Sequence, residues 1–161
     1  MVVNKRNMRR HAPLMTYGHQ TPADIKGFTF CIVRNPYDRA VSLYWHYKRR
    51  KRYRHTFPYF LQTLQSGIDP AGLWNVRGFS QANSQTDWFQ PGIDYVGRFE
   101  KLQESYDFIC DKLNIPRHTV PHKNSGNHVD WQTFYNQKTA RLVEKFYAKD
   151  FEIIGYEKGT F

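Results

Sequence analysis

Short apolar runs alternate with longer amphipathic stretches along most of this chain. The nearly unbroken apolar run 28–33 predicts a strand that is covered on both faces, and 94–100 predicts a second short strand. Amphipathic stretches predict helices over about 36–52, 56–67, 102–113 and 134–148. Strands that alternate with helices favour an α/β fold, in which a small parallel sheet is layered by helices.

Apolar residues at helical spacing predict which side of the last two helices faces the core. These inward-facing residues are Leu102, Tyr106, Ile109, Leu113, Leu142, Val143, Phe146 and Tyr147. Segments 69–91 and 114–132 are rich in turn-forming and polar residues and predict long connections, and 151–156 is predicted as an extended tail packed on the body. A connection as long as 69–91 inside a compact domain is often functional.

The junction between the first strand and the first helix carries the richest local pattern. Arg34 follows the strand directly. Asn35 is a good N-cap, Pro36 suits the first helical position, and Asp38 favours the positive end of the helix dipole. A helix N-terminus beside an arginine attracts anions. Arg34 and Ser42 can therefore converge on one phosphate, from the loop and from the second helical turn.

Segment 34–42 begins Arg-Asn-Pro-Tyr-Asp-Arg and ends with a serine eight positions after the first arginine. It resembles the 3′-phosphate-binding motif of sulfotransferases that use 3′-phosphoadenosine 5′-phosphosulfate (PAPS), in the carbohydrate and glycosaminoglycan branch and its bacterial relatives. Later segments follow in the family's order. Residues 94–102 are similar to its second strand and turn, 123–125 to its late loop, and 134–156 to its closing helix and tail.

The resemblance implies a P-loop-NTPase-like sulfotransferase fold and transfer of a sulfuryl group from PAPS to a hydroxyl of a carbohydrate-like or acidic acceptor, with no metal. The residues that it assigns to the nucleotide are Arg34, Ser42, Arg39, Lys123 and Asn124. Arg39 shares a helix face with Ser42, but it can equally well pair with a carboxylate. Gln85 and Trp88, in the long connection, are weaker candidates for shaping a pocket, and Trp88 suits packing better.

A hydroxyl acceptor needs a general base, and histidine is the usual residue near neutral pH. In the carbohydrate branch a catalytic histidine commonly precedes the 3′-phosphate strand. His19 falls in that region and is the candidate catalytic base, with His11 as the alternative. A purely structural role for His19 is about equally compatible with the sequence.

One part of the family pattern has no counterpart here. The family normally opens with a strand and a Lys-x-Gly-(Gly/Thr)-Thr turn around the 5′-phosphosulfate, whereas the first glycine of this chain is Gly18. We therefore expect the first strand and its loop to be missing. Three explanations follow, in order of preference: a fragment or a misplaced start, a degenerate relative that binds the nucleotide only, or charge supplied by basic residues among 5–10. A missing strand would leave a sheet edge open to self-association.

Charge is concentrated in the first third of the chain. Residues 1–55 hold 13 of the 24 Lys and Arg but 2 of the 14 Asp and Glu, and the net charge is +10. The basic run 48–54, interleaved with aromatic residues, indicates a polyanionic partner. The alternative function is thus a non-catalytic module that binds a sulfated glycan or nucleic acid, of which nucleic acid is the less favoured. A nucleotide kinase is disfavoured because the sequence has no Walker lysine loop.

Length and composition predict one domain over 1–161, with a basic N-terminal segment at 1–16. Cys31 and Cys110 are predicted as buried, unpaired residues of a reducing compartment. No apolar run is long enough to predict a membrane span, and 1–10 has no apolar core of a secretory signal. Through the resemblance, the compartment would be the cytoplasm for a bacterial enzyme, or the Golgi lumen for a fragment of an animal-type enzyme.

Overall fold

Two short parallel strands form the sheet of this protein, as a computed structural model describes it for residues 27–49, 54–66, 82–87, 92–121 and 130–161. Strand β1 (Phe30–Val33) pairs with β2 (Tyr95–Arg98), so that Phe30 lies opposite Tyr95 and Val33 lies opposite Arg98. Parallel neighbours need a long crossover, and here the chain between them includes two helices. The α/β fold is confirmed.

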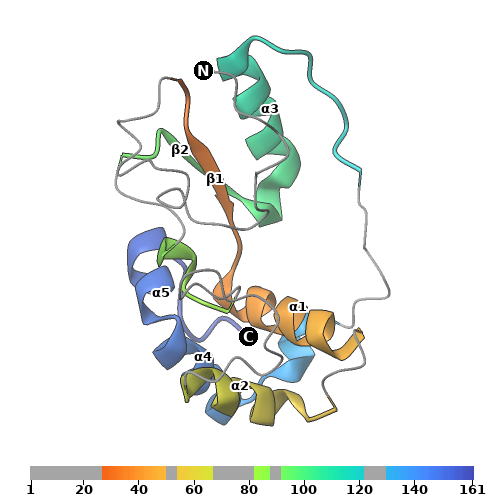
Figure 1. The fold of residues 1–161 in the computed structure, drawn as a ribbon, viewed down its shortest axis with the longest axis vertical. Helices are drawn as coiled ribbons and strands as arrows, with labels where there is room; N and C mark the ends of the chain where they lie inside the picture. Colours follow the sequence, from red (N-terminus) through yellow and green to blue (C-terminus); the bar gives the residue numbers. More distant parts are fainter. Residues whose placement is uncertain (1–26, 50–53, 67–81, 88–91, 122–129) are drawn as a thin grey trace, which may run out of the picture.

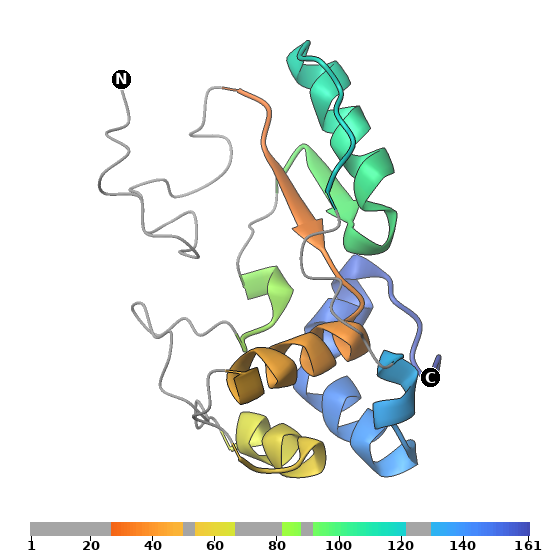
Figure 2. The same ribbon diagram turned by 90° about the vertical axis from the view of Figure 1, so that its right-hand side faces the viewer.

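The described helices are α1 (Pro36–Arg49), α2 (Phe57–Gln65), α3 (Leu102–Leu113), α4 (Gln137–Phe146) and α5 (Ala148–Ile154). Short 3-10 turns add η4 (Gln85–Asp87), η5 (Phe99–Lys101) and η6 (Trp131–Phe134). Helix α3 lies alongside the two strands, and the other four helices gather at the carboxyl end of β1 (Figures 1 and 2). None of the described helices is long and apolar enough to cross a membrane.

Helix α1 supplies the centre of the helical core. After Pro36 at its start, its buried residues recur at helical spacing and are Tyr37, Ala40, Val41, Tyr44 and Tyr47. They pack against apolar residues of α2, α4 and α5, namely Phe57, Phe60, Leu61, Leu64, Ala140, Val143 and Phe151. Edge-to-face ring contacts dominate this core, for example between Tyr37 and Phe151, whose ring centroids lie 5.1 Å apart. The core therefore holds the first turns of α1 in a fixed position.

Helix α3 approaches β2 closely because Gly97 has no side chain. A Cβ at this position would lie 2.6 Å from Cδ1 of Ile32 and 2.8 Å from the side chain of Ser105. The Ser105 hydroxyl accepts a hydrogen bond from the Arg98 amide at 3.1 Å and so bridges helix and strand. Gly97 thus sets the distance between α3 and the sheet.

The prediction that the first strand is covered on both faces is wrong. Val33 is buried, but Phe30 is 46% exposed and Ile32 is 36% exposed. Helix α3 packs over β2, where the Tyr95 ring lies 4.3 Å from the Phe108 ring, and the described residues leave Phe30 and Ile32 of β1 partly exposed. Cys31 is half-buried, while Cys110 on α3 is buried as predicted, and both cysteines are free.

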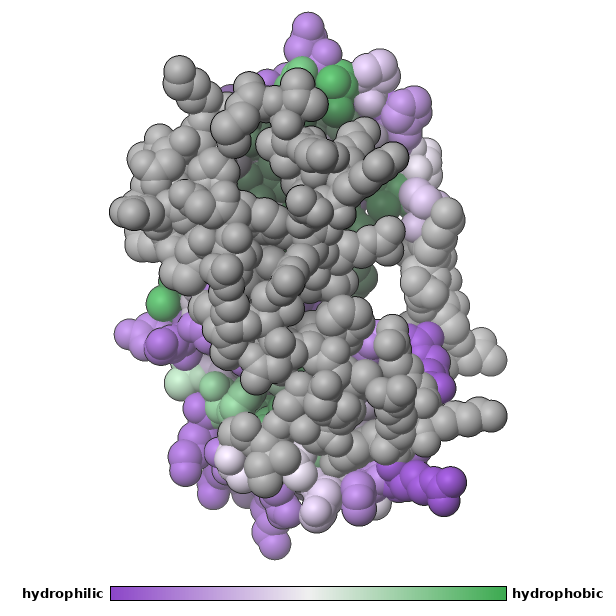
Figure 3. Space-filling model, in the orientation of Figure 1, coloured by the Kyte–Doolittle hydropathy of each residue, from purple (hydrophilic) through white to green (hydrophobic). Residues whose placement is uncertain are grey.

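The carboxyl-terminal part of the chain also differs from expectation. Residues 151–156 are not an extended tail, because 148–154 form helix α5, which ends at Gly155 with a φ of +74°. The preceding helix begins later than predicted, at Gln137, where Asn136 and Thr139 form a capping box. Leu113 is 43% exposed and does not belong to the buried stripe of α3. Apolar colour at the upper end of Figure 3 lies over this carboxyl end of α3.

Candidate functional site

Arg34 lies at the carboxyl end of β1, one residue before the N-cap of α1. The Asn35 side chain accepts a hydrogen bond from the Tyr37 amide at 2.9 Å, and its carbonyl accepts from the Arg39 amide at 2.8 Å. Asn35 therefore caps α1 as predicted. The Asn35 amide donates to the Glu100 carboxylate at 2.6 Å, so a carboxylate from η5 already lies at the helix N-terminus.

The guanidinium of Arg34 is held from two sides. Nε and Nη2 donate to the two carboxylate oxygens of Asp38, one helical turn later, at 2.5 and 2.7 Å. The guanidinium carbon lies 4.4 Å from the centre of the Phe99 ring. The Arg34 side chain is 25% exposed. Because a guanidinium has five N–H groups, this pair leaves three of them for another acceptor such as a phosphate.

Ser42 lies on α1 one turn beyond Asp38 and on the same side of the helix. This side is opposite the buried stripe that includes Ala40 and Tyr44, and Ser42 itself is half-buried. The helix therefore places Arg34, its partner Asp38 and Ser42 along one line. The Asp38 carboxylate stands between Arg34 and Ser42 on this line, so the convergence of these two residues on one phosphate stays a prediction.

Gln85 of η4 contacts the main chain of Arg34 from a distant part of the sequence. Its Oε1 accepts from the Arg34 amide at 2.8 Å, and its Nε2 donates to the Arg34 carbonyl at 2.8 Å. The side-chain amide thus pairs with both polar groups of one residue, as a neighbouring strand would. The sequence offered Gln85, in the long connection, as a weak candidate for shaping a pocket, and the structure places it beside the junction between β1 and α1.

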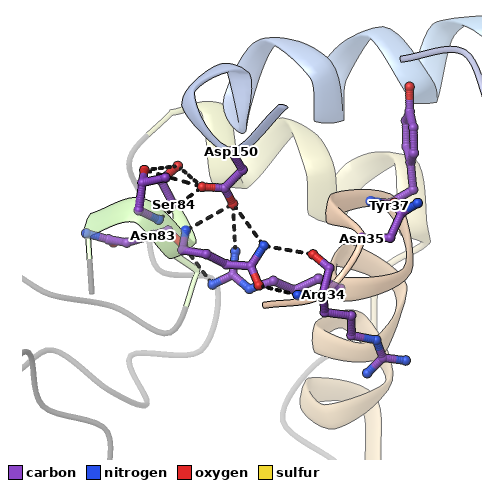
Figure 4. Close-up of polar contacts among 9 residues, drawn as sticks. Arg34, Asn35, Tyr37, Asn83, Ser84 and Asp150 are labelled. Atoms are coloured by element: carbon purple, nitrogen blue, oxygen red, sulfur yellow. Dashed lines mark hydrogen bonds and ion pairs between the residues drawn. The ribbon is translucent and has the colours of Figure 1, made fainter. Parts of the chain in front are cut away.

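A buried carboxylate from α5 supports this contact. Asp150 is fully buried, and its oxygens accept from the Ser84 hydroxyl at 2.5 Å, from the Gln85 amide at 3.0 Å and from the Thr86 amide at 3.2 Å. Figure 4 shows these donors around Asp150, with the Arg34 side chain pointing away from them. The cluster therefore acts on the main chain at Arg34 and leaves the guanidinium directed elsewhere.

Arg39 belongs to the same buried cluster. Its Nη2 donates to the Asn83 carbonyl at 2.7 Å, its Nη1 lies 3.8 Å from Asp150, and its guanidinium lies over the Tyr147 ring at 5.0 Å. The approach to Asp150 matches one of the two alternatives that the sequence left open for Arg39, namely pairing with a carboxylate. Arg39 and Arg34 thus point to different surroundings, although they are five residues apart.

The ionisable side chains in the strand and core are poor nucleophiles. Burial raises the pKa of the Cys31 thiol to about 11, so the thiol is protonated at neutral pH. Burial, together with the hydrogen bond that Tyr37 donates to Glu144, raises the pKa of Tyr37 above its usual value. Within the described ranges no group of three His, Cys, Asp or Glu could hold a metal ion. Among the described residues, the groups beside Arg34 are therefore hydrogen-bond donors and acceptors.

Several sequence candidates lie outside the described residues. These are the catalytic candidate His19, its alternative His11, the late-loop residues Lys123 and Asn124, and Trp88. The basic run 48–54 is described at Lys48, Arg49 and Arg54, which are exposed. Tyr44 and Tyr47 of the same helix are buried in the core, so they offer no stacking surface to a nucleic acid.

A hollow of about 320 Å³ lies next to the Arg34 site. It is lined by Phe99, Glu100, Lys101, Leu102, Gln103, Glu104, Val120 and Pro121. Phe99 and Glu100 also contact Arg34 and Asn35, so the hollow borders the candidate phosphate site. Two carboxylates against one ammonium make it a poor cradle for a second phosphate.

Sequence reasoning missed Asp150, Ser84, Thr86 and Glu100. A usable clue existed for Asp150, because a charged residue stands between the apolar Tyr147 and Phe151 at helical spacing. No local clue marked the other three, since each acts on a partner more than 60 residues away.

Comparison with known proteins identifies the family of this chain. A family model described as "Sulfotransferase family" matches residues 2–157. A relative from Archaeoglobus fulgidus, named "Uncharacterized protein", is 26% identical over 88 residues, which cover 54% of this chain and 68% of that protein. No solved structure matches significantly. Since the family model spans nearly the whole chain, strand β1, the Arg34 junction and the closing helices included, the chain belongs to the sulfotransferase family.

Proposed function

We propose that this protein binds PAPS and transfers its sulfuryl group to a hydroxyl of a carbohydrate-like acceptor, with Arg34 and Ser42 holding the 3′-phosphate of the nucleotide. The observation that carries this proposal is how the Arg34 side chain is exposed and held. This side chain is 25% exposed at a strand–helix junction, is oriented by Asp38 and Phe99, and keeps three N–H groups for a further acceptor. A phosphate is the acceptor that best matches this fork.

Sulfuryl transfer requires donor and acceptor to be aligned, the leaving group's charge to be neutralised and one proton to be accepted. The acceptor oxygen forms a bond to sulfur as the bond from sulfur to the bridging phosphate oxygen breaks. The proton of the hydroxyl passes to a general base, for which we propose His19. Lys123 and Asn124 are proposed as further contacts to the nucleotide. Arg39 is proposed to support Asp150, because its contacts to Asn83 and Asp150 already engage it.

A transfer assay tests this function. The protein is incubated with PAPS that carries ³⁵S in the sulfuryl group and with a neutral oligosaccharide, a uronic acid-containing oligosaccharide or no acceptor. We expect label in an oligosaccharide, with kcat/KM for PAPS reduced about tenfold to a hundredfold in Arg34→Ala, since charged hydrogen bonds are worth roughly 1.5–3 kcal/mol each. A Ser42→Ala variant should show a smaller reduction of the same kind.

Arg117→Ala is the matched control, because Arg117 also forms a two-bond pair with an aspartate, Asp111, at 2.8 and 2.6 Å, but lies beyond the end of α3. This variant should keep the activity of the wild type. An equal reduction in Arg34→Ala and Arg117→Ala, or label transfer unaffected by Arg34→Ala, contradicts the proposed site. Salt-sensitive binding to heparin without any affinity for the nucleotide would favour the polyanion-binding module instead.

A further inference from the structure

We propose that Gln85, held in place by Asp150, is a positioning residue that aims Arg34 at the 3′-phosphate. This inference rests on the proposed function and adds to it a second layer of residues behind the phosphate site. It starts from the contact of one buried side chain with both main-chain polar groups of Arg34.

The main chain leaves the sheet at Arg34. Val33 is the last residue paired with β2, opposite Arg98, and Asn35 begins the helix, so Arg34 lies between two regular elements. The Gln85 amide accepts from the Arg34 N–H and donates to the Arg34 C=O, both at 2.8 Å. Two bonds on either side of one Cα restrict rotation at that residue. They therefore set the direction in which the Arg34 side chain leaves the backbone.

Gln85 is itself fixed by a carboxylate. Oδ2 of Asp150 accepts from the Gln85 main-chain amide at 3.0 Å and from Nε2 of the same residue at 3.3 Å. The amide orientation is determined by these partners, because Nε2 faces two acceptors and Oε1 faces a donor. The cluster thus connects α5, through η4, to the residue that would hold the phosphate.

The far end of Arg34 is positioned separately, by Asp38 and the Phe99 ring. A long side chain that is fixed only at its tip can still shift at its base, and a displacement of about 1 Å at a binding group can cost about a hundredfold in rate. The base contact from Gln85 and the tip contact from Asp38 together define one guanidinium position. The Gln85 contact should accordingly influence affinity for the 3′-phosphate and leave the rest of the nucleotide unaffected.

The test compares two ligands that differ only at the 3′ position, adenosine 3′,5′-bisphosphate and adenosine 5′-monophosphate, by isothermal titration calorimetry. The measured quantity is the ratio of their dissociation constants. Gln85→Met retains the length of the side chain but removes both bonds to Arg34, and should lower the preference for the 3′-phosphate about tenfold. Gln85→Asn keeps the amide group, but its side chain is one methylene shorter and cannot reach the main chain of Arg34. It supplies the same test if Gln85→Met does not fold.

Thr139→Ala is the matched control for a merely structural effect. Thr139 is buried, and its hydroxyl accepts a hydrogen bond from the Asn136 amide at 2.9 Å in the cap of α4, away from Gln85 and Asp150, so this variant should lower the thermal midpoint and leave the ratio unchanged. In an Arg34→Ala background, Gln85→Met should have no further effect on the ratio. If Arg34→Ala lowers the preference for the bisphosphate but neither Gln85 variant changes it, the positioning role of Gln85 is overturned and the proposed function is not. Wild-type protein with no preference for the bisphosphate overturns the proposed function and this inference together.

Discussion

At the scale of single residues, the Asp150 side chain joins helix α5 to residues 84–86 and to helix α1. Its carboxylate is fully buried and accepts hydrogen bonds from Ser84, Gln85 and Thr86, while Arg39 lies 3.8 Å away. A buried carboxylate is tolerated when donors and a cation surround it, and removing one partner leaves the others uncompensated. The geometry at Arg34 therefore depends on a residue at the other end of the chain.

Replacing this carboxylate by an amide should be costly. In Asp150→Asn one acceptor becomes an NH₂ group that faces the donors of residues 84–86, and we expect a loss of about 2–4 kcal/mol in the free energy of unfolding. Urea denaturation followed by circular dichroism measures this loss. Glu152→Gln, exposed on the same helix, is the control and should change stability by less than about 0.5 kcal/mol. Equal stability of the two variants would show that the Asp150 cluster contributes little.

At the scale of elements, the close approach of α3 to the sheet depends on one glycine. Gly97→Ala would place a Cβ 2.6 Å from Ile32 and 2.8 Å from Ser105. Either the helix or the strand must shift, and we expect destabilisation of about 1–3 kcal/mol. Thermal unfolding measures this destabilisation. Val96→Thr is the control, because Val96 is the neighbouring residue of β2 and is 40% exposed. A Gly97→Ala protein as stable as wild type would mean that α3 moves freely on the sheet.

The two strands are joined at their starts by Asp94 and Thr29. The Thr29 amide and hydroxyl donate to the Asp94 carboxylate at 2.7 and 2.8 Å, and these bonds lower the pKa of Asp94 below its usual value of 3.8. A lowered pKa in the folded state contributes stability at pH values above the unfolded pKa, and this contribution disappears as the pH falls through the folded value.

Asp94→Asn should therefore be less stable than wild type at pH 7, and the difference should narrow below about pH 4 as the wild-type carboxylate becomes protonated. Urea midpoints measured at pH 7, 5 and 3 test this. Glu157→Gln, exposed near the carboxyl end of the chain, should follow the wild type throughout. A stability difference between Asp94→Asn and wild type that stays constant from pH 7 to pH 3 would refute the role of the charged form.

At the scale of the whole molecule, what could be predicted depends on how far apart the interacting residues lie. The strand, the Asn35 cap and the Arg34–Ser42 spacing lie within about a dozen consecutive residues, and the structure contains all three. The contacts of Asp150 and Gln85 with residues 51 to 66 positions away follow from packing and leave no local pattern. The extended tail was a wrong prediction because Gly155 ends a short helix that packing of Phe151 stabilises.

The central claim also concerns the whole molecule: the junction at Arg34 binds the 3′-phosphate of the nucleotide. Isothermal titration calorimetry with adenosine 3′,5′-bisphosphate on wild type, Arg34→Ala and Arg117→Ala tests it most directly. We predict saturable binding to wild type and Arg117→Ala, and a dissociation constant about tenfold to a hundredfold higher for Arg34→Ala. No binding to the wild type, or the same dissociation constant in all three proteins, would contradict the account.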